Sequence, residues 1–227
     1  MSKKNFVIAI DGFSSCGKST VAKALAKQLN FVFVDSGAMY RAVTLYVQRH
    51  NIALEDEDAI QKALDEIHID FIPNPDKTQI LLNGEDVSDA IRTMEVSDYV
   101  SEVSAIKSVR KAMVHQQQQL GKKRDIVMDG RDIGTTVFPE AALKIFMTAS
   151  PQIRAERRYA ELTAKGELVT MEEVKENLSH RDHIDSTREE SPLRQAEDAI
   201  VLDNSDLNQE EQLAFVLDLV KQRLNKI

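Results

Sequence analysis

Residues 12–19 restrict the possible folds of this chain more than any other segment. Their sequence, Gly-Phe-Ser-Ser-Cys-Gly-Lys-Ser, satisfies the pattern G-x-x-x-x-G-K-[ST]. The apolar run 6–10 before them predicts a short buried strand. After them, apolar residues at positions 21, 25 and 29 predict an amphipathic helix over 18–29. A tight turn between a strand and a helix directs backbone N–H groups toward one point, which favours a phosphate group.

This phosphate-binding loop, or P-loop, predicts a nucleoside triphosphate as ligand. We expect Lys18 to reach the β- and γ-phosphates, and the Ser19 hydroxyl to coordinate the Mg²⁺ that bridges them. Asp35, at the end of a second predicted strand, is expected to hold the water shell of the metal or to contact Lys18, and Asp129 is an equal candidate for that water shell. The residues expected to surround the triphosphate are Gly12, Phe13, Ser14, Ser15, Cys16, Gly17, Lys18, Ser19 and Thr20.

The composition indicates a globular protein without disulfides. The 227 residues are enough for one large domain with a modest insertion. The formal net charge of −8 disfavours duplex nucleic acid or an anionic membrane as the main partner. A single cysteine, Cys16, indicates a reducing compartment. No segment approaches the ~20 apolar residues of a membrane span and the N-terminus lacks a signal-peptide core, so we expect a cytoplasmic protein.

Apolar runs that suit buried parallel strands alternate with helical patterns along most of the chain, which predicts an α/β fold with a parallel sheet. The expected strands cover residues 6–10, 31–34, 126–128, 143–147 and 199–202. The expected helices cover residues 18–29, 37–49, 57–66, 94–103, 105–120, 151–164, 171–183 and 208–225. Thr170 with Glu173 predicts a capping box for the seventh helix, and Asn208 is the expected cap of the last.

One region departs from this alternation. Residues 68–72 and 78–82 have the pattern of short strands, with a turn at 73–76 between them and a second turn at Asn83-Gly84. We therefore expect an antiparallel insertion of roughly 30–40 residues at one edge of the sheet, too small to fold alone.

Polar segments follow two of the predicted strands, at the edge where open α/β sheets place their ligands. After the second strand, Arg41 offers a planar guanidinium group to phosphate oxygens. After the strand over 126–128, Gly130 permits a ligand to approach closely and Arg131 suits a phosphate. The carboxylate of Asp132 can accept a hydrogen bond from an exocyclic amine.

Six of the thirteen arginines lie between residues 154 and 194, a region with two predicted helices around a polar turn at 165–167. A solvated face is the ordinary explanation for arginines among glutamates. In an acidic protein, however, this local concentration predicts a lid that folds over phosphates. The first helix carries Arg154, Arg157 and Arg158, and the second carries Arg181, Asp185 and Arg188, which share one face if the helix extends that far.

These features suit phosphoryl transfer between two anionic reactants, which must be held in line and away from water. No separate general base is evident. A hydroxyl acceptor usually needs a carboxylate base, whereas a phosphate oxygen does not. The sequence therefore favours a phosphate monoester as acceptor.

Longer motifs make the chain resemble the bacterial cytidylate kinases, also called CMP kinases, over nearly its whole length. The run D-G-R-D-I-G-T-T-V-F-P at 129–139 is far more specific than the P-loop. The other matching segments are 10–12, 35–41, 84–88, 91–93 and 144–150.

The resemblance implies a P-loop NTPase fold of the nucleoside monophosphate (NMP) kinase type. Such a fold has a five-stranded parallel sheet with flanking helices, a small antiparallel NMP-binding insertion and a short helical lid. The expected core covers about 1–66, 104–150 and 195–227, the insertion about 67–103 and the lid about 151–194. The implied reaction transfers the γ-phosphoryl group of ATP, with Mg²⁺, to CMP or dCMP and yields ADP with CDP or dCDP, in pyrimidine nucleotide salvage. The expected state is a monomer.

The resemblance also implies roles for residues that would otherwise look like ordinary surface residues. Those similar to the cytosine-facing residues of the family are Ser36, Ser101, Arg110 and Asp132. The N4 amine of cytosine suits Asp132, and its N3 and O2 suit Arg110 and Ser101. Uracil has a carbonyl group at position 4, which a carboxylate would repel.

The remaining assignments concern phosphates and the pentose. Arg41, Arg131 and Arg188 are similar to the arginines on the CMP phosphate, Asp185 and Arg181 to the pair near the pentose, and Arg157 and Arg158 to the lid arginines on the ATP phosphates. Tyr40 and Gly130 complete the expected CMP site. The residues expected to act in catalysis are Lys18, Arg131, Arg158 and Arg188.

The chain departs from the family pattern at Phe13, where proline is frequent, and at Cys16, where a small residue is common. Both positions contribute backbone groups, so the departures affect nucleotide affinity at most. Cys16 additionally predicts a reversible sensitivity to mild peroxide, which a Cys16→Ser variant would lack.

Three alternatives compete with this reaction, one of them another kinase and two of them from other functional classes. A kinase for another small acceptor, such as UMP, AMP or shikimate, is disfavoured by Asp132 and Arg110. A P-loop GTPase would need an N-K-x-D motif, but the only Asn-Lys pair, at 225–226, is followed by Ile227. A nucleotide-binding module without turnover would not need the full set of arginines.

Overall fold

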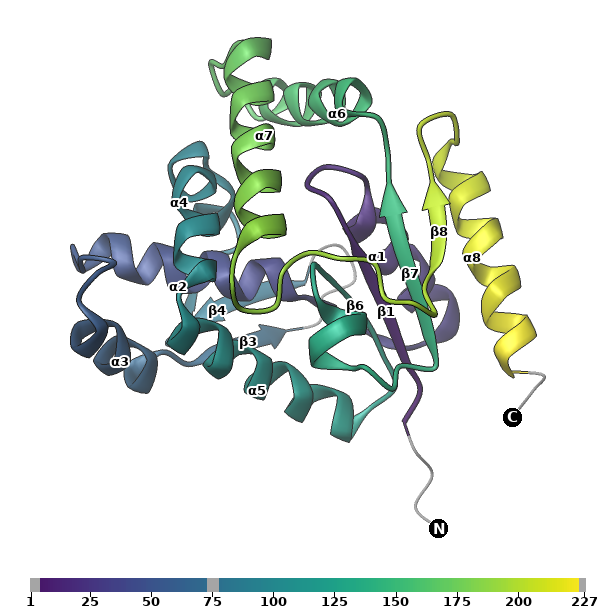
Figure 1. Ribbon diagram of the computed structural model, residues 1–227, viewed down its shortest axis with the longest axis horizontal. Helices are drawn as coiled ribbons and strands as arrows, with labels where there is room; N and C mark the ends of the chain where they lie inside the picture. The colour runs from purple at the N-terminus through teal and green to yellow at the C-terminus, as the bar shows by residue number, and fades with distance from the viewer. Residues whose placement is uncertain (1–4, 73–77, 225–227) are drawn as a thin grey trace.

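The computed structural model describes residues 5–72 and 78–224. Its centre is a sheet of five parallel strands in the order β2–β6–β1–β7–β8 (Figure 1). The expected parallel sheet is therefore confirmed, and each strand contains most of one predicted apolar run. The strands are β1 (Val7–Gly12), β2 (Val32–Asp35), β6 (Ile126–Gly130), β7 (Leu143–Thr148) and β8 (Ile200–Asp203).

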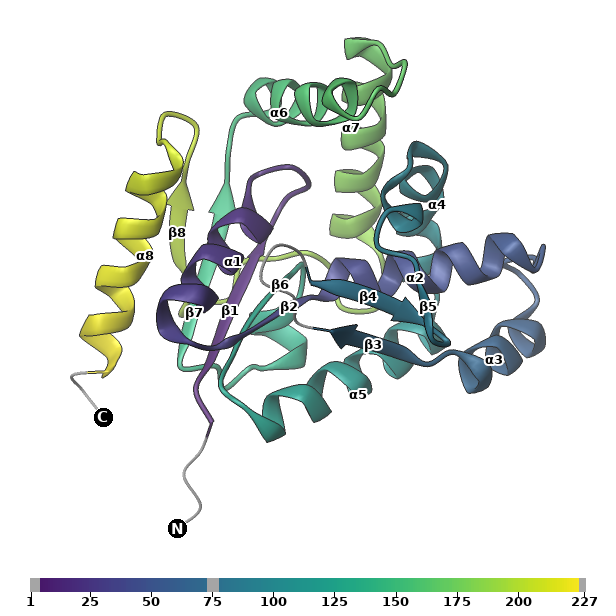
Figure 2. The same cartoon turned by 180° about the vertical axis from the view of Figure 1, so that it is seen from behind.

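Successive side chains of β1 point to opposite faces of the sheet, and helices cover both faces. Ile8 and Ile10 lie in the apolar cluster beneath α1 (Lys18–Leu29) and α8 (Gln209–Leu224). Val7 and Ala9 lie in the opposite cluster, beneath α5 (Lys107–Lys123). Figure 2 shows α1 and α8 together on the near side of the sheet. Because both faces are covered, the strands are apolar almost throughout.

The insertion forms a second sheet, of three antiparallel strands in the order β3–β4–β5. Its apolar side chains share one buried cluster with α2 (Ser36–Arg49) and α5, so it does not have a core of its own. The predicted turn at 73–76 lies outside the described residues. The elements of this part are α3 (Glu57–Glu66), β3 (Ile69–Ile72), β4 (Gln79–Leu82), β5 (Glu85–Asp86), the 3₁₀ turn η1 (Ala90–Arg92) and α4 (Met94–Ala105).

The arginine-rich helices α6 (Pro151–Ala164) and α7 (Met171–Thr187) extend beyond the carboxyl ends of the strands (Figure 1). The capping box of Thr170 and Glu173 is present at the start of α7, and Asn208 caps the last helix through the backbone N–H of Glu211. α7 extends four residues past the predicted end at 183, so Asp185 lies on the helix. Arg188 is its C-cap, with an extended backbone, and so lies just outside the helical face that the sequence suggested.

The polar ends of the strands meet at one edge of the sheet. The register places Asp35 opposite Asp129, and Asp11 opposite Gly130. Residues 12–17 leave β1 at this same edge and lead into α1. In the described part of the chain, no helix is long and apolar enough to cross a membrane.

A substitution at Gly12 tests how the P-loop is joined to the sheet. Gly12 has φ of 149°, and an added Cβ would clash with the backbone carbonyl oxygen of Met147 on β7. We expect Gly12→Ala to lower the free energy of unfolding by about 1–3 kcal/mol through overpacking, in addition to the cost of the backbone conformation. Thermal and urea unfolding without ligand measure it.

Gly84→Ala is the matched control. Gly84 also has a positive φ, of 87°, but an added Cβ meets nothing within 4 Å. This variant retains the conformational cost, about 1–2 kcal/mol, without the clash. Equal losses in the two variants would refute the role assigned to the Met147 carbonyl.

Candidate active site

The P-loop lies at the carboxyl end of β1 and holds its lysine close to its own backbone. The Lys18 ammonium group donates to the Phe13 carbonyl at 2.6 Å and lies 3.7 Å from the Cys16 sulfur. Burial, followed by the charge of Arg131, lowers the pKa of Lys18. Asp35 does not contact Lys18, contrary to one of the two expectations for that carboxylate. The lysine side chain is thus folded onto the backbone of its own loop.

Asp129 and Asp35 face each other across β6 and β2, but they have different partners. Asp129 accepts a hydrogen bond from the Ser19 hydroxyl at 2.6 Å, and its other carboxylate oxygen is buried with no partner among the described residues. Burial and the charge of Asp35 raise the pKa of Asp129 to about 6. Asp35 instead binds two guanidinium groups, those of Arg41 at 3.1 Å and Arg92 at 3.4 Å.

A cavity of about 930 Å³ opens above the P-loop. Its walls come from α1, β2, α6, α7 and the segment before α8, and they are rich in cationic groups. Carboxylates of Asp35, Asp129 and Glu161 also reach it. The cationic side chains that line this large cavity are Lys18, Lys23, Arg41, Arg92, Arg131, Arg157, Arg158 and Arg181.

A smaller cavity of about 60 Å³ adjoins the large one. The two cavities share Gly37, Arg41, Gly130, Arg131 and Arg181 as lining residues, so a ligand in one lies next to a ligand in the other. The small cavity is lined further by Ser36, Tyr40, Ser101, Arg110, Asp132, Asp185 and Arg188, and thus by every residue that the sequence placed near CMP.

A buried ion pair forms one wall of the small cavity. The guanidinium group of Arg110 lies 2.6 Å from the Asp132 carboxylate, and both side chains are less than 5 % exposed. Burial alone would lower the pKa of Arg110, but the charge of Asp132 raises it above its ordinary value. Arg110 also stacks over the ring of Tyr40 at 5.1 Å. Ser36 donates to the backbone carbonyl of Asp129 at 2.6 Å, which orders this part of the wall.

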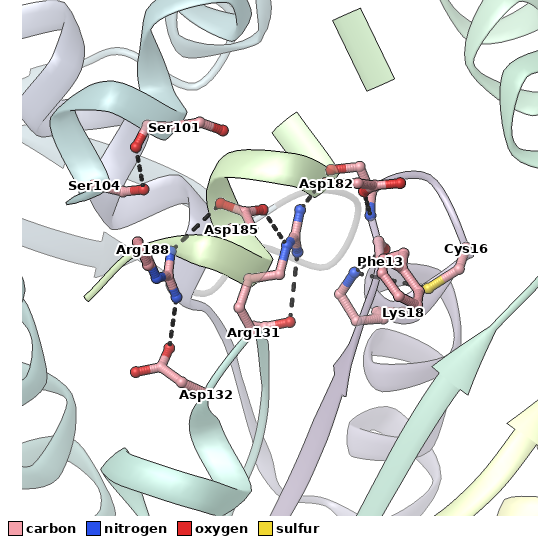
Figure 3. A network of polar contacts seen from close by, with 12 residues as sticks. Phe13, Cys16, Lys18, Ser101, Ser104, Arg131, Asp132, Asp182, Asp185 and Arg188 are labelled. Atoms are coloured by element: carbon pink, nitrogen blue, oxygen red, sulfur yellow. Dashed lines mark hydrogen bonds and ion pairs between the residues drawn. The ribbon is translucent and has the colours of Figure 1, made fainter. Parts of the chain in front are cut away.

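Asp185 lies between two of the expected phosphate-binding arginines (Figure 3). It accepts from Arg131 at 2.8 Å and from Arg188 at 3.4 Å. Burial alone would raise the pKa of Asp185, but these two arginines hold it below its ordinary value. Arg131 also donates to the Ser14 hydroxyl at 2.7 Å, which joins this group to the P-loop. Burial and the neighbouring Arg131 lower the pKa of Arg181 to about 10.

The arginines of α6 are held at the rim of the large cavity by neutral and acidic groups. Arg157 donates to the side-chain and backbone oxygens of Asn204 at 3.0 and 2.9 Å. Arg158 donates to Glu161 and, at 3.1 Å, to Ser97 of α4. Arg154 has a different role from its two neighbours, because it pairs with Asp182 and donates to the Ser14 carbonyl.

Sequence reasoning missed some residues of this site. Arg92 lies in a segment quoted for the family resemblance, but nothing in the local sequence separates it from a surface arginine. Asn204 is fully buried and donates to the Cys16 carbonyl of the P-loop at 2.7 Å. The Cys16 thiol itself is fully buried, so its predicted reaction with peroxide would require the loop to open.

Comparisons with known proteins agree with the resemblance. A model of the cytidylate kinase family matches residues 8–222. A cytidylate kinase of Bacteroides fragilis is 56% identical over 219 residues, which cover 94% of this chain and 96% of that protein. A cytidylate kinase of Phocaeicola vulgatus is 52% identical over 227 residues, covering 98% and 99%. A cytidylate kinase of Flavobacterium psychrophilum is 54% identical over 222 residues, covering 96% and 98%.

A solved structure of an uncharacterised protein from Eubacterium ventriosum is similar over 96% of this chain and 99% of its own. Its TM-score is 0.52 and its sequence identity is 12%. Such a likeness concerns the fold alone.

Because Arg110 and Asp132 form a buried ion pair, we expect replacement of Arg110 alone to lower the free energy of unfolding more than replacement of both residues does. Arg110→Met leaves Asp132 buried, and among residues 5–72 and 78–224 its remaining cationic partner is Arg188, at 3.8 Å. We expect it to lower the free energy of unfolding by about 3 kcal/mol. The double variant Arg110→Met/Asp132→Leu leaves no carboxylate behind, and we expect it to recover at least half of that loss. Urea unfolding of the single and double variants measures both values.

Arg49→Met serves as control, since Arg49 pairs with Glu85 at 2.7 Å on the exposed surface. Its loss of stability should be much smaller. A double variant that is less stable than Arg110→Met would contradict the account of the buried pair.

Proposed function

Because this chain belongs to the cytidylate kinase family, we propose that it transfers the γ-phosphoryl group of ATP to CMP or dCMP, with CDP or dCDP and ADP as products. The observation that carries this proposal is the pair of adjoining cavities. The large one contains the P-loop, and the small one ends on the buried Arg110–Asp132 pair.

ATP binds in the large cavity in this proposal. The P-loop backbone, residues 12–20, surrounds the triphosphate, and Lys18 leaves the Phe13 carbonyl to contact the β- and γ-phosphates. Arg157 and Arg158 extend from α6 over the same phosphates. An incoming phosphate competes for Lys18 and Arg157 better than their present neutral partners do, because hydrogen bonds between ions are about twice as strong. Arg158 differs from these two, because one of its present partners is the Glu161 carboxylate.

The donor set fits Mg²⁺, which prefers oxygen ligands and usually keeps several waters. We assign Ser19 as a direct ligand and Asp129 as the carboxylate that holds the water shell. Asp129 has one buried oxygen without a partner among the described residues, whereas both oxygens of Asp35 already bind arginines. When bound, the metal would neutralise charge on the β- and γ-phosphates.

The acceptor enters the small cavity with its base against the Arg110–Asp132 pair. Because this cavity measures only about 60 Å³, its walls must move apart to admit a nucleotide. The Asp132 carboxylate accepts from the N4 amine of cytosine, while Arg110 and Ser101 donate to N3 and O2. The phosphate of CMP lies toward the shared wall, where Arg41, Arg131 and Arg181 line both cavities. Arg188 and Arg92 contribute further positive charge there, and Asp185 with Arg181 contacts the pentose.

Catalysis then depends on position and charge. The acceptor is a phosphate oxygen, so no side chain has to remove a proton. Lys18, Arg131, Arg158 and Arg188 balance the charge that spreads over the transferring group. Asp185 keeps Arg131 and Arg188 in place before the substrates arrive, which lowers the cost of ordering them at that step.

A kinase for UMP or another acceptor is the nearest competing function. The residues that distinguish it from a CMP kinase are those expected to face the base, Arg110 and Asp132 above all. We also propose that the protein acts as a monomer, as the family resemblance implies, and that its single cysteine reflects a reducing, cytoplasmic location.

The first test is ADP formation from ATP and Mg²⁺ with CMP, dCMP, UMP, AMP and GMP as separate acceptors. We expect rapid turnover with CMP and dCMP and little with the others. Asp132→Asn should lower the ratio of kcat/KM for CMP to that for UMP by at least about tenfold, because one acceptor of the N4 amine is lost. Equal turnover of UMP by the parent enzyme would refute the account of base selection, and ADP release without an acceptor would indicate an NTPase.

A second test separates the two candidate carboxylates of the metal site. Calorimetry gives the Kd of ATP with Mg²⁺ and with EDTA. We expect Asp129→Asn to lose most of the Mg²⁺-dependent gain in ATP affinity, and Asp35→Asn, which removes a partner of Arg41 and Arg92, to keep it. The reverse result would move the water shell to Asp35.

A further inference from the structure

Asp11 is a buried carboxylate that the reaction itself does not use. It is the penultimate residue of β1, directly before the P-loop, and its side chain is 5 % exposed. One oxygen accepts the backbone N–H of Ile133 at 2.8 Å, and the other accepts the backbone N–H of Gly134 at 2.7 Å. Both carboxylate oxygens are thus used by one short segment of chain.

That segment begins immediately after Asp132. Residues Ile133–Val137 form a single π-helical turn, whose first N–H groups have no partners within the turn itself. The side chain of Asp132 does not cap this turn and is instead directed to Arg110. Asp11 therefore supplies the acceptors that the turn needs, and it leaves Asp132 free to face the small cavity.

Burial of the Asp11 carboxyl group costs free energy, which argues for a specific role of this residue. Within the described residues Asp11 makes no ion pair, and burial raises its pKa to about 7. A neutral asparagine would avoid the cost of a buried charge but would offer one acceptor oxygen instead of two. Because each backbone N–H binds a different oxygen of Asp11, an asparagine in the same position would place its NH₂ group against one of the two donors.

The position of Gly134 shows how closely this turn approaches Asp11 on β1. A Cβ at Gly134 would lie 3.3 Å from the Asp11 carboxylate and 3.1 Å from the Lys144 side chain. A larger residue would push this N–H away from Asp11 without changing any charge.

We propose that Asp11 is a positioning residue for base selection, which holds the 132–134 segment so that Asp132 meets Arg110 in the geometry that distinguishes cytosine from uracil. This inference rests on the proposed function of Asp132. Since Asp11 adjoins Gly12, it also fixes the base-selecting segment relative to the P-loop, and hence the acceptor relative to the donor.

The test is the ratio of kcat/KM for CMP to that for UMP, measured with both acceptors on one preparation. This ratio is independent of the fraction of active enzyme, so a loss of stability alone does not change it. In Asp11→Asn an amide N–H faces one of the two backbone N–H groups. We expect the ratio to fall about tenfold, as for one lost hydrogen bond, with a higher KM for CMP and less than about a twofold change in the KM for ATP.

Together with Asp11→Asn, the single variant Asp132→Asn and the double variant Asp11→Asn/Asp132→Asn form a double-mutant cycle. If Asp11 acts through Asp132, the double variant has the same ratio as Asp132→Asn alone. Gly134→Ala, which disturbs the same contact without removing charge, should lower the ratio too, and it replaces Asp11→Asn if that variant does not fold. Asp56→Asn is the matched control, because Asp56 also accepts a backbone N–H, from Ala59, but at the start of α3. Its ratio should equal that of the parent.

The outcomes separate the two claims. If Asp132→Asn lowers the ratio and neither Asp11→Asn nor Gly134→Ala does, the role of Asp11 is wrong and base selection by Asp132 stands. If the effects of Asp11→Asn and Asp132→Asn multiply, Asp11 does not act through Asp132, which also overturns the proposal. If Asp132→Asn leaves the ratio unchanged, base selection by Asp132 fails, and the inference fails with it.

Discussion

Repulsion between like charges is the constraint on which this site depends. Lysine and arginine side chains crowd around the large cavity, where Lys18 is buried, and Arg110 and Arg188 are buried beside the small one. Burial, followed by the charge of Arg131, lowers the pKa of Arg181 to about 10. Carboxylates must therefore be interleaved with the cations if the substrate-free protein is to stay folded.

The sheet supplies several of these carboxylates at fixed positions. Asp35 and Asp129 end neighbouring strands in register, and Asp132 follows two residues after β6. Each has separate partners: Asp35 binds Arg41 and Arg92, Asp129 binds Ser19, and Asp132 binds Arg110. Asp185 comes from α7 instead, and it connects that helix to Arg131, which follows β6.

The sequence predicted the fold well where a pattern is local. Apolar runs and helical spacing located the strands and most helix boundaries, because both faces of the sheet are covered and the pattern is clear. The turn over Ile133–Val137 was missed because it depends on Asp11, a residue more than a hundred positions away. The P-loop follows from spacing alone, whereas Arg110 required the family resemblance. On a helix rich in polar residues it resembles a surface arginine, and only the tertiary structure buries it, leaving 2 % exposed.

The contact between α4 and α7 has a consequence for the passage of nucleotides. The bonds Asn177–Asp98 and His180–Glu102, at 2.7 Å each, join α7 to α4 at the molecular surface. Exposed contacts of this kind contribute little free energy, in contrast to the buried pairs deeper in the site. Separation of α4 from α7 would break these exposed bonds and would leave the Arg110–Asp132 pair intact, because neither helix supplies that pair. Exposed bonds hold α4 to α7, whereas a buried ion pair forms the wall of the small cavity. In the proposed reaction, products can therefore leave between the two helices while the wall that receives the next substrate stays in place.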